Sequence, residues 1–229
     1  MARFTRIHVA QKMAEFGMIP VFFNHDIEIC KKVLEACHNG GIRLFEFTNR
    51  GDYAHIVFES LNKFAEKELP DMILGIGSVI DASTATLYMQ LGSNFIVSPL
   101  LNEEMAYVCN RRKILWSPGC GSVSEISRAE ALGAEIVKIF PGAQVGGPKF
   151  VAAVKGPMPW TQIMPTGGVE PTEANLTEWF KAGVICCGMG SQLIKSDLIK
   201  AGNFKQIEED IKVAVALAKR LREQYPVKL

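Results

Sequence analysis

The sequence predicts an α/β protein, a (β/α)8 TIM barrel preceded by one extra N-terminal helix. Short β-rich apolar runs alternate with longer segments of helical periodicity, a pattern typical of parallel strands joined by crossover helices. Eight such units fit a compact barrel. With 229 residues, 48% of them hydrophobic, the chain is long enough for one large core but short for two ordinary domains. We therefore expect residues 1–229 to form a single domain.

The expected strands are the short apolar runs, and a helix is expected after each of them. These runs cover 19–23, 43–49, 72–79, 94–99, 114–118, 136–141, 162–166 and 184–188. The extra helix is expected over about 5–16 and a closing helix over 204–225. The closing helix carries one apolar stripe, made of Ile207, Ile211, Ala214, Ala218 and Leu221.

Helix ends are indicated by capping residues and glycines. Asp26 and Asp81 stand at expected N-caps, and Ser122 opens a capping box with Glu125. The helix-ending glycines are Gly92, Gly133 and Gly183.

A doubly wound sheet that binds a dinucleotide is the alternative architecture. Its fingerprint requires a third glycine after Gly75 and Gly77, but Ile80 occupies that position. The run also lies in the third expected strand instead of the first. The barrel is therefore the preferred prediction.

Charge and composition favour a small-molecule substrate. Twenty-five basic and 24 acidic residues give a net charge of +1 without long runs of one sign, so neither nucleic acid nor a membrane surface is an expected partner. No apolar stretch approaches the roughly 18 residues of a membrane span, and the first residues do not resemble a signal peptide.

Cysteines and histidines indicate neither disulfides nor a metal. The six cysteines are scattered through apolar segments, as expected of reduced thiols in a cytoplasmic protein. The four histidines lie far apart, and no metal-ligand spacing occurs. Cys120 is a small loop residue or a reactive thiol, while Cys186 and Cys187 are expected to pack within a strand.

Lys138 is the first candidate for chemistry, because active sites of such barrels lie at the carboxyl ends of the strands. It shares one strand face with Ile136 and Phe140. On an outward face the amine would extend along its apolar stem to solvent. On an inward face, desolvation would lower its pKa and expose a nucleophilic amine. The spacing leaves both possibilities open.

Glu46 is the second candidate, with Thr48 and Arg50 on the same strand face. An unpaired buried carboxylate is costly, so one interpretation is a structural ion pair with Arg50 or Lys138. In the functional interpretation Glu46 transfers protons and Arg50 binds a substrate carboxylate.

Glycine-rich turns follow the seventh and eighth strands, where barrels commonly bind phosphate. They contain Gly167 and Gly168, then Gly190 and Ser191, whose backbone N–H groups can approach an anion. Ser78 and Pro99, at the ends of the third and fourth strands, could line the pocket or simply end their strands.

Six ordered motifs together resemble a known family. They are E-x-T-x-R, G-x-G-S-V, S-P, K-x-F-P, P-T-G-G and G-x-G-S, on strands two, three, four, six, seven and eight. The set resembles the class I aldolases of 2-dehydro-3-deoxy-6-phosphogluconate (KDPG), which overlap with those of 4-hydroxy-2-oxoglutarate (KHG). The likeness extends from about Ile19 to Leu193.

The resemblance implies a metal-independent enzyme without cofactor, commonly a homotrimer, that acts on a 2-keto acid through a lysine imine. Lys138 would form the imine, and Glu46 would move protons through water. Arg50, Ser78 and Thr166 would bind the substrate carboxylate or flank the imine. Pro99 and Phe140 would line the pocket. The distal phosphate or carboxylate would be held by Gly167, Gly168, Gly190 and Ser191.

Several positions depart from the family pattern. Ser78 stands where threonine is common but keeps the hydroxyl, and Gly142 stands where alanine is usual. Asn49 replaces an apolar residue and, with Leu100 and Leu101, could change substrate contacts. The preferred keto acid therefore remains open.

Two other functions stay possible on the sequence. A phosphosugar epimerase or isomerase would share the phosphate loops and use Glu46 as a base, without Lys138 as a nucleophile. A ligand-binding barrel without turnover is the other, although Lys138, Glu46 and Arg50 together argue against it.

Overall fold

The computed structural model describes residues 2–227, which contain nine strand segments and ten helices. The strands are β1 (Met18–Phe22), β2 (Leu44–Thr48), β3 (Ile73–Gly77), β4 (Phe95–Val97), β5 (Leu115–Ser117), β6 (Gly119–Cys120), β7 (Val137–Ile139), β8 (Ile163–Pro165) and β9 (Cys187–Met189). The helices are α1 (Arg6–Phe16), α2 (Ile27–Asn39), α3 (Ala54–Glu68), α4 (Ala82–Gln90), α5 (Glu103–Arg112), α6 (Val123–Ala131), α7 (Gly147–Lys155), α8 (Glu173–Lys181), α9 (Ser196–Lys200) and α10 (Phe204–Gln224). The expected single domain also includes residues 1, 228 and 229, which lie outside the described range, and its limits stay a prediction.

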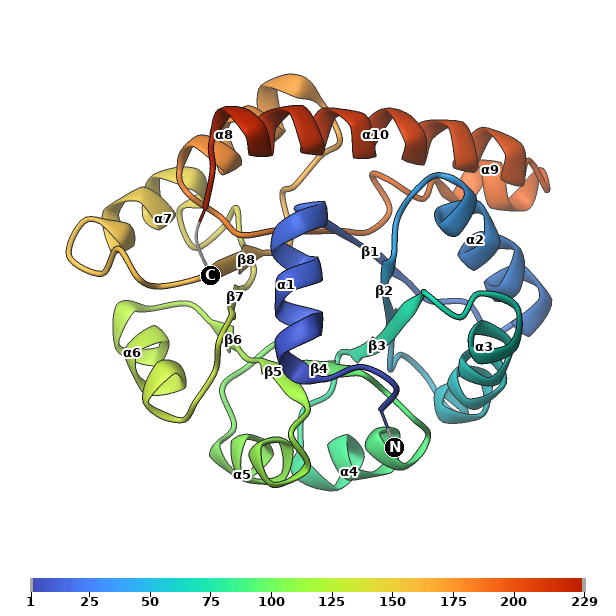
Figure 1. Cartoon of the computed structure of the whole chain (residues 1–229), viewed down its shortest axis with the longest axis horizontal. Helices are drawn as coiled ribbons and strands as arrows, with labels where there is room; N and C mark the ends of the chain where they lie inside the picture. Colours follow the sequence, from blue (N-terminus) through green and yellow to red (C-terminus); the bar gives the residue numbers. More distant parts are fainter. Residues whose placement is uncertain (1, 228–229) are drawn as a thin grey trace.

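The strands form a parallel barrel, as the alternation in the sequence predicts. One run pairs in the order β5-β4-β3-β2-β1-β9 and the other in the order β6-β7-β8. The runs meet where Thr166 bridges to Gly188 and the Ile185 N–H donates to the Ile163 carbonyl at 2.9 Å. The helices surround this barrel (Figure 1). The (β/α)8 prediction with an extra N-terminal helix is confirmed.

The fifth predicted strand, 114–118, is broken into two short segments. Pro118 separates β5, which pairs with β4, from β6, which pairs with β7. Proline has no N–H to donate to a ladder, but the Pro118 carbonyl accepts from the Lys138 N–H at 2.8 Å. The chain thus changes its pairing partner at the proline and joins the two runs into one barrel.

The strands are also shorter than predicted, and the last one lies later in the chain. The run 136–141 contributes only Val137–Ile139 to the ladder, and the predicted strand 184–188 corresponds to Cys187–Met189. The residues just before these two paired segments are also apolar, since they are buried as well. Hydrophobicity therefore overestimated the length of the hydrogen-bonded segments.

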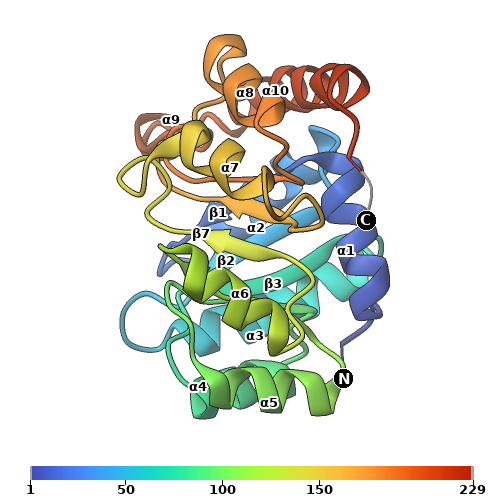
Figure 2. The same ribbon diagram turned by 90° about the vertical axis from the view of Figure 1, so that its left-hand side faces the viewer.

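The protein has two apolar cores, one outside the barrel wall and one inside it. The outer core lies between strands and helices, while the inner core contains inward residues of the strands, among them Ile19, Leu44 and Ile136. Val9 and Met13 of α1 belong to the inner core, so α1 closes the barrel at the amino ends of the strands. Figures 1 and 2 show α1 standing across this end. The opposite end, where the strands finish, stays open for a site.

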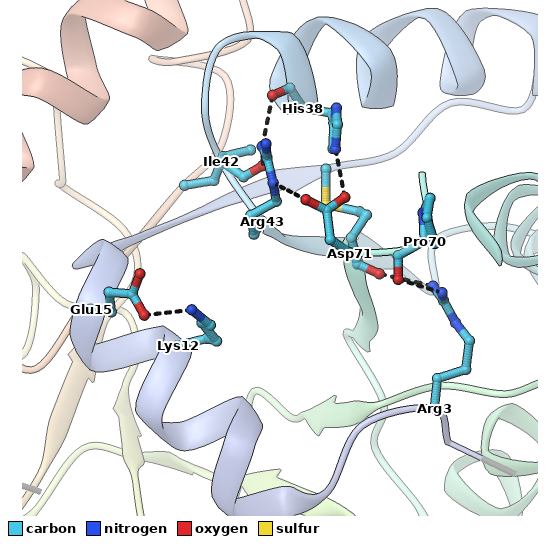
Figure 3. A network of polar contacts seen from close by, with 9 residues as sticks. Arg3, Lys12, Glu15, His38, Ile42, Arg43, Pro70 and Asp71 are labelled. Carbon is cyan, nitrogen blue, oxygen red and sulfur yellow. Dashed lines mark hydrogen bonds and ion pairs between the residues drawn. The ribbon is translucent and has the colours of Figure 1, made fainter. Parts of the chain in front are cut away.

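A polar network reinforces the closed end (Figure 3). The Arg3 guanidinium donates to the Pro70 carbonyl at 3.0 Å. The Asp71 carboxylate accepts from Arg43 and lies 2.7 Å from the His38 ring nitrogen. These contacts tie the segment before α1 and the end of α2 to the loop that leads into β3.

Helix ends follow the capping signals in the sequence. The side chains of Asp26, Asp81 and Ser122 each accept from backbone N–H groups at the starts of α2, α4 and α6. The predicted stripe of α10 is buried along its whole length, and α10 packs against α2 and α8. Between β9 and α10 lies the short helix α9, which the sequence reading did not separate.

Candidate active site

Lys138 points into the barrel from β7. Its side chain is 5% exposed, and its same-face neighbour Ile136 belongs to the inner core, which decides against the outward orientation. The Lys138 Nζ lies 5.0 Å from the centre of the Phe140 ring. Burial lowers the pKa of Lys138, and the charge of Arg50 lowers it further, against the opposing effect of Glu46. A buried amine of this kind can lose its proton and act as a nucleophile.

Glu46 points into the same interior from β2 and is 1% exposed. A Cβ atom at Gly77 would collide with its carboxylate, so the glycine of β3 leaves the space that the carboxylate occupies. Burial raises the pKa of Glu46, although the charges of Lys138 and Arg50 oppose the rise. The Oε2 atom has no hydrogen-bond partner among residues 2–227. The carboxyl group is therefore available to exchange a proton.

The two groups face one interior without forming a direct ion pair. Within residues 2–227, no nitrogen of Lys138 or Arg50 lies within 4.0 Å of a Glu46 oxygen. A structural ion pair therefore does not account for Glu46. Burial lowers the pKa of Lys138 and raises the pKa of Glu46, so it favours the uncharged form of each group. An amine and a carboxyl group of this kind suit carbonyl chemistry.

A cavity of about 600 Å³ lies at the carboxyl ends of the strands. Seven of the eleven predicted site residues line it: Arg50, Phe140, Thr166, Gly167, Gly168, Gly190 and Ser191. Lys138 and Glu46 are not lining residues because they lie deeper in the barrel, where both are almost fully buried. The cavity and the buried pair thus occupy the same end of the fold.

The glycine turn after β8 is held rigidly in place. The Gly142 N–H donates to the Thr166 carbonyl at 2.8 Å, which links the loops after β7 and β8. On the other side, Asn175 of α8 donates to the Gly168 carbonyl at 3.1 Å and accepts from the Glu170 N–H at 2.9 Å. Gly168 has a φ of +77°, and a Cβ there would collide with the neighbouring loop. The turn therefore requires glycine and has a fixed shape.

Ser78 and Pro99 do not line the cavity. They follow β3 and β4, whereas the cavity is lined from β1, β2 and the segments after β7, β8 and β9. Their assigned roles stay predictions. Asn49 also turns away from the cavity, because its side chain accepts from the Tyr88 hydroxyl of α4 at 2.7 Å. It supports the turn before Arg50 and does not change the cavity surface.

Several polar residues of the site were missed in the sequence. Thr48, Asn24 and Lys200 line the cavity. Thr48 carried a signal, since it shares the face of Glu46. Lys200 did not, because it belongs to none of the six motifs.

The remaining predictions concern thiols, metals and membranes. Cys120 is buried, and burial raises its pKa to about 12, so it packs as a small thiol. Cys186 and Cys187 are buried as expected. In the described part of the chain, no group of three or more His, Cys, Asp or Glu residues is placed to hold a metal ion. None of the helices between residues 2 and 227 is long and apolar enough to cross a membrane.

A (β/α)8 barrel with a buried lysine near the carboxyl end of a strand and a cavity above it is the arrangement of a class I aldolase, a lyase that works through an imine. Residues 9–210 match the family model described as KDPG and KHG aldolase. The chain belongs to this family, and it is an aldolase.

Similar proteins agree with this assignment. A 2-dehydro-3-deoxy-phosphogluconate aldolase of Pseudoalteromonas atlantica is 33% identical over 87% of this chain and 90% of its own length. A KHG/KDPG aldolase of Escherichia coli is 30% identical over 88% of this chain and 92% of its own length. A KDPG aldolase structure from Legionella pneumophila, with pyruvate captured as a covalent carbinolamine, has a TM-score of 0.79 and 28% identity. It aligns with 93% of this chain and 97% of its own.

Proposed function

We propose that this aldolase cleaves a 2-keto-3-deoxy acid with a hydroxyl at C4 into pyruvate and an aldehyde, using Lys138 as the nucleophile. The phosphorylated six-carbon acid KDPG is the preferred substrate, and KHG is the shorter alternative. The observation that carries the proposal is the burial of the Lys138 amine inside the barrel, beneath a cavity open to solvent. The carbinolamine in the Legionella relative supports the same chemistry.

The reaction begins at the carbonyl carbon C2. The neutral Lys138 amine attacks C2 to form a carbinolamine, which takes up a proton and loses water to give a cationic imine. Burial favours this step, because it lowers the pKa of Lys138 and so increases the fraction of free amine near neutral pH.

The bond between C3 and C4 then breaks. Its electron pair moves to C3 as the imine accepts the charge and becomes an enamine, while the C4 hydroxyl loses its proton and the aldehyde leaves. The enamine takes up a proton at C3, and water releases pyruvate and restores the amine. Glu46 moves protons through water in these steps, a role suited to a carboxyl whose pKa is raised by burial.

The two ends of the substrate have separate contacts. Arg50 binds the carboxylate next to the imine, with Ser78 assisting and Thr166 and Phe140 beside the imine. The backbone of the turns at Gly167 and Gly190 holds the distal phosphate or carboxylate. The cavity lining supports this assignment for all of these residues except Ser78.

The chain is further proposed to act without a metal or cofactor, as a cytoplasmic homotrimer with no nucleic acid or membrane partner. The net charge of +1, without long runs of one sign, supports a small-molecule substrate. Sedimentation measures the assembly, and turnover after treatment with a chelator tests the metal independence.

The decisive experiment is trapping with borohydride. Pyruvate plus borohydride is expected to add one reduced pyruvyl group to the chain, on the peptide that contains Lys138. Lys138→Met is expected to form no adduct and to lose cleavage while it stays folded. An adduct on Lys149 or Lys155, or no adduct at all, contradicts the proposal.

A further inference from the structure

The wall of the cavity after β9 contains a cation that the phosphate loops do not include. Beyond Gly190 and Ser191, the lining continues through α9, where Ser196 and Lys200 contribute. Lys200 is the last residue of α9 and is exposed to solvent. Its position at the rim places an ammonium group beside the loops proposed to bind the distal end of the substrate.

Lys200 differs from the neighbouring lysines because it lacks a carboxylate partner. Lys195, at the start of α9, lies 2.8 Å from Asp210, and Lys205 of α10 lies 2.9 Å from Glu208. Lys200 makes no ion pair or side-chain hydrogen bond within residues 2–227. No carboxylate of residues 2–227 therefore neutralises its charge, which is available to an anion in the cavity.

The distribution of charge in the cavity points to a substrate with two anionic ends. Among the described residues, the lining contains two cations, Arg50 and Lys200, and no aspartate or glutamate. Arg50 follows β2 and Lys200 follows β9, and β1 lies between these strands in the barrel. The two positive groups therefore stand on separate parts of the rim, so that one molecule with a negative group at each end can satisfy both.

We infer that Lys200 determines specificity by pairing with the anionic group at the far end of the keto acid. This inference rests on the proposed aldolase reaction, in which Arg50 binds the near carboxylate. Backbone donors select the shape of the distal group, whereas a lysine adds a full charge and favours an anionic aldehyde half over a neutral one. Because Lys200 is exposed, salt screens its interaction with the substrate.

The test compares Lys200→Gln and Lys200→Arg with the control Lys195→Gln. The control removes a lysine charge from the same segment but leaves the cavity lining intact. We expect Lys200→Gln to lower kcat/KM for KDPG about fivefold, as for loss of one solvent-exposed ion pair. Turnover of the unphosphorylated six-carbon acid is expected to stay unchanged in Lys200→Gln. For Lys200→Arg and Lys195→Gln, kcat/KM for KDPG is expected to stay near the value of the unaltered protein.

Two further measurements identify the distal anionic group and show whether the loss of kcat/KM is electrostatic. A selective loss for KHG instead of KDPG shows that the distal group is a carboxylate. The salt dependence of kcat/KM for the anionic substrate is expected to weaken in Lys200→Gln. Equal losses of kcat/KM for acids with a neutral and with an anionic distal end, or no loss for any substrate, overturn the inference.

Failure of the proposed function gives a different result. In that case the unaltered protein forms no adduct on Lys138 with pyruvate and borohydride. Equilibrium binding of inorganic phosphate then still tests Lys200, since the expected weakening in Lys200→Gln does not depend on imine formation. Equal phosphate affinity in Lys200→Gln and the unaltered protein contradicts the role of Lys200.

Discussion

Gly77→Ala is expected to disable catalysis by displacing one carboxylate while leaving the rest of the barrel in place. A Cβ atom at this position would lie 2.6 Å from Cδ of Glu46 and 2.9 Å from Cγ, and closer still to Oε1. Ordinary contact begins at 3.4 Å, so the carboxyl group has to move by about 1 Å, a misplacement that can cost about 100-fold in rate. The φ of Gly77 lies outside the left-handed region, so alanine itself does not strain the backbone.

The assay follows pyruvate release from KDPG with a coupled dehydrogenase, and thermal unfolding is measured in parallel. Turnover of Gly77→Ala is expected to fall about 100-fold. Two glycine substitutions separate this effect from loss of stability. Gly75→Ala crowds the Phe95 ring instead of Glu46 and is expected to lose about 1–3 kcal/mol of stability, whereas Gly121→Ala meets only ordinary contacts and changes neither quantity.

A folded Gly77→Ala variant that turns over at the rate of the unaltered protein would refute this role of Gly77. That result would mean that Glu46 can leave its present position without loss of function. A fall in turnover that merely follows the fall in unfolding temperature, in Gly77→Ala and Gly75→Ala alike, would equally contradict a specific effect on the carboxylate.

Four other outcomes are expected. Glu46→Gln should lower turnover about 100- to 10,000-fold while pyruvate binding changes little, and near-normal turnover would assign Glu46 a structural role. Because burial lowers the pKa of Lys138, the free amine forms as pH rises through a value below 10.5. The pH profile of borohydride trapping should therefore have its midpoint below 10.5, and a midpoint at 10.5 would contradict the shift. Ser191→Asp should raise KM for KDPG by repulsion but leave the pyruvate adduct intact, as kinetics and mass spectrometry can check. Asn175→Ala removes the side chain that bonds both sides of the turn at Gly168, so kcat/KM for KDPG should fall about tenfold, more than for the unphosphorylated acid.

The sequence by itself determined the architecture and the chemical candidates. Eight alternating units, the capping residues Asp26 and Ser122, and the stripe of α10 are local patterns, because helix and strand periodicities are written in neighbouring residues. Polar residues at the ends of apolar strands are also visible locally. For that reason Lys138 and Glu46 were found before the fold was known.

Only the tertiary structure decided which way these residues point. Strands of a parallel barrel are buried on both faces, so hydrophobicity cannot separate inside from outside. The inner core around Ile136 settles the orientation of Lys138. Barrel closure also explains two other residues. Gly77 leaves the space that the Glu46 carboxylate occupies, and Pro118 lies where the fifth strand changes its pairing partner.

Contacts between distant segments were equally out of reach of the sequence. On the sequence, Asn49 could change substrate contacts, but its side chain accepts a hydrogen bond from Tyr88, 39 residues away, and does not line the cavity. Lys200 carried no motif, yet it shares one cavity with Arg50. Such groups meet because parallel strands bring their carboxyl ends to one face of the barrel, whatever their separation along the chain. The pattern of residues thus predicts the fold and the reactive groups, while closure of the barrel determines which side chains share the cavity.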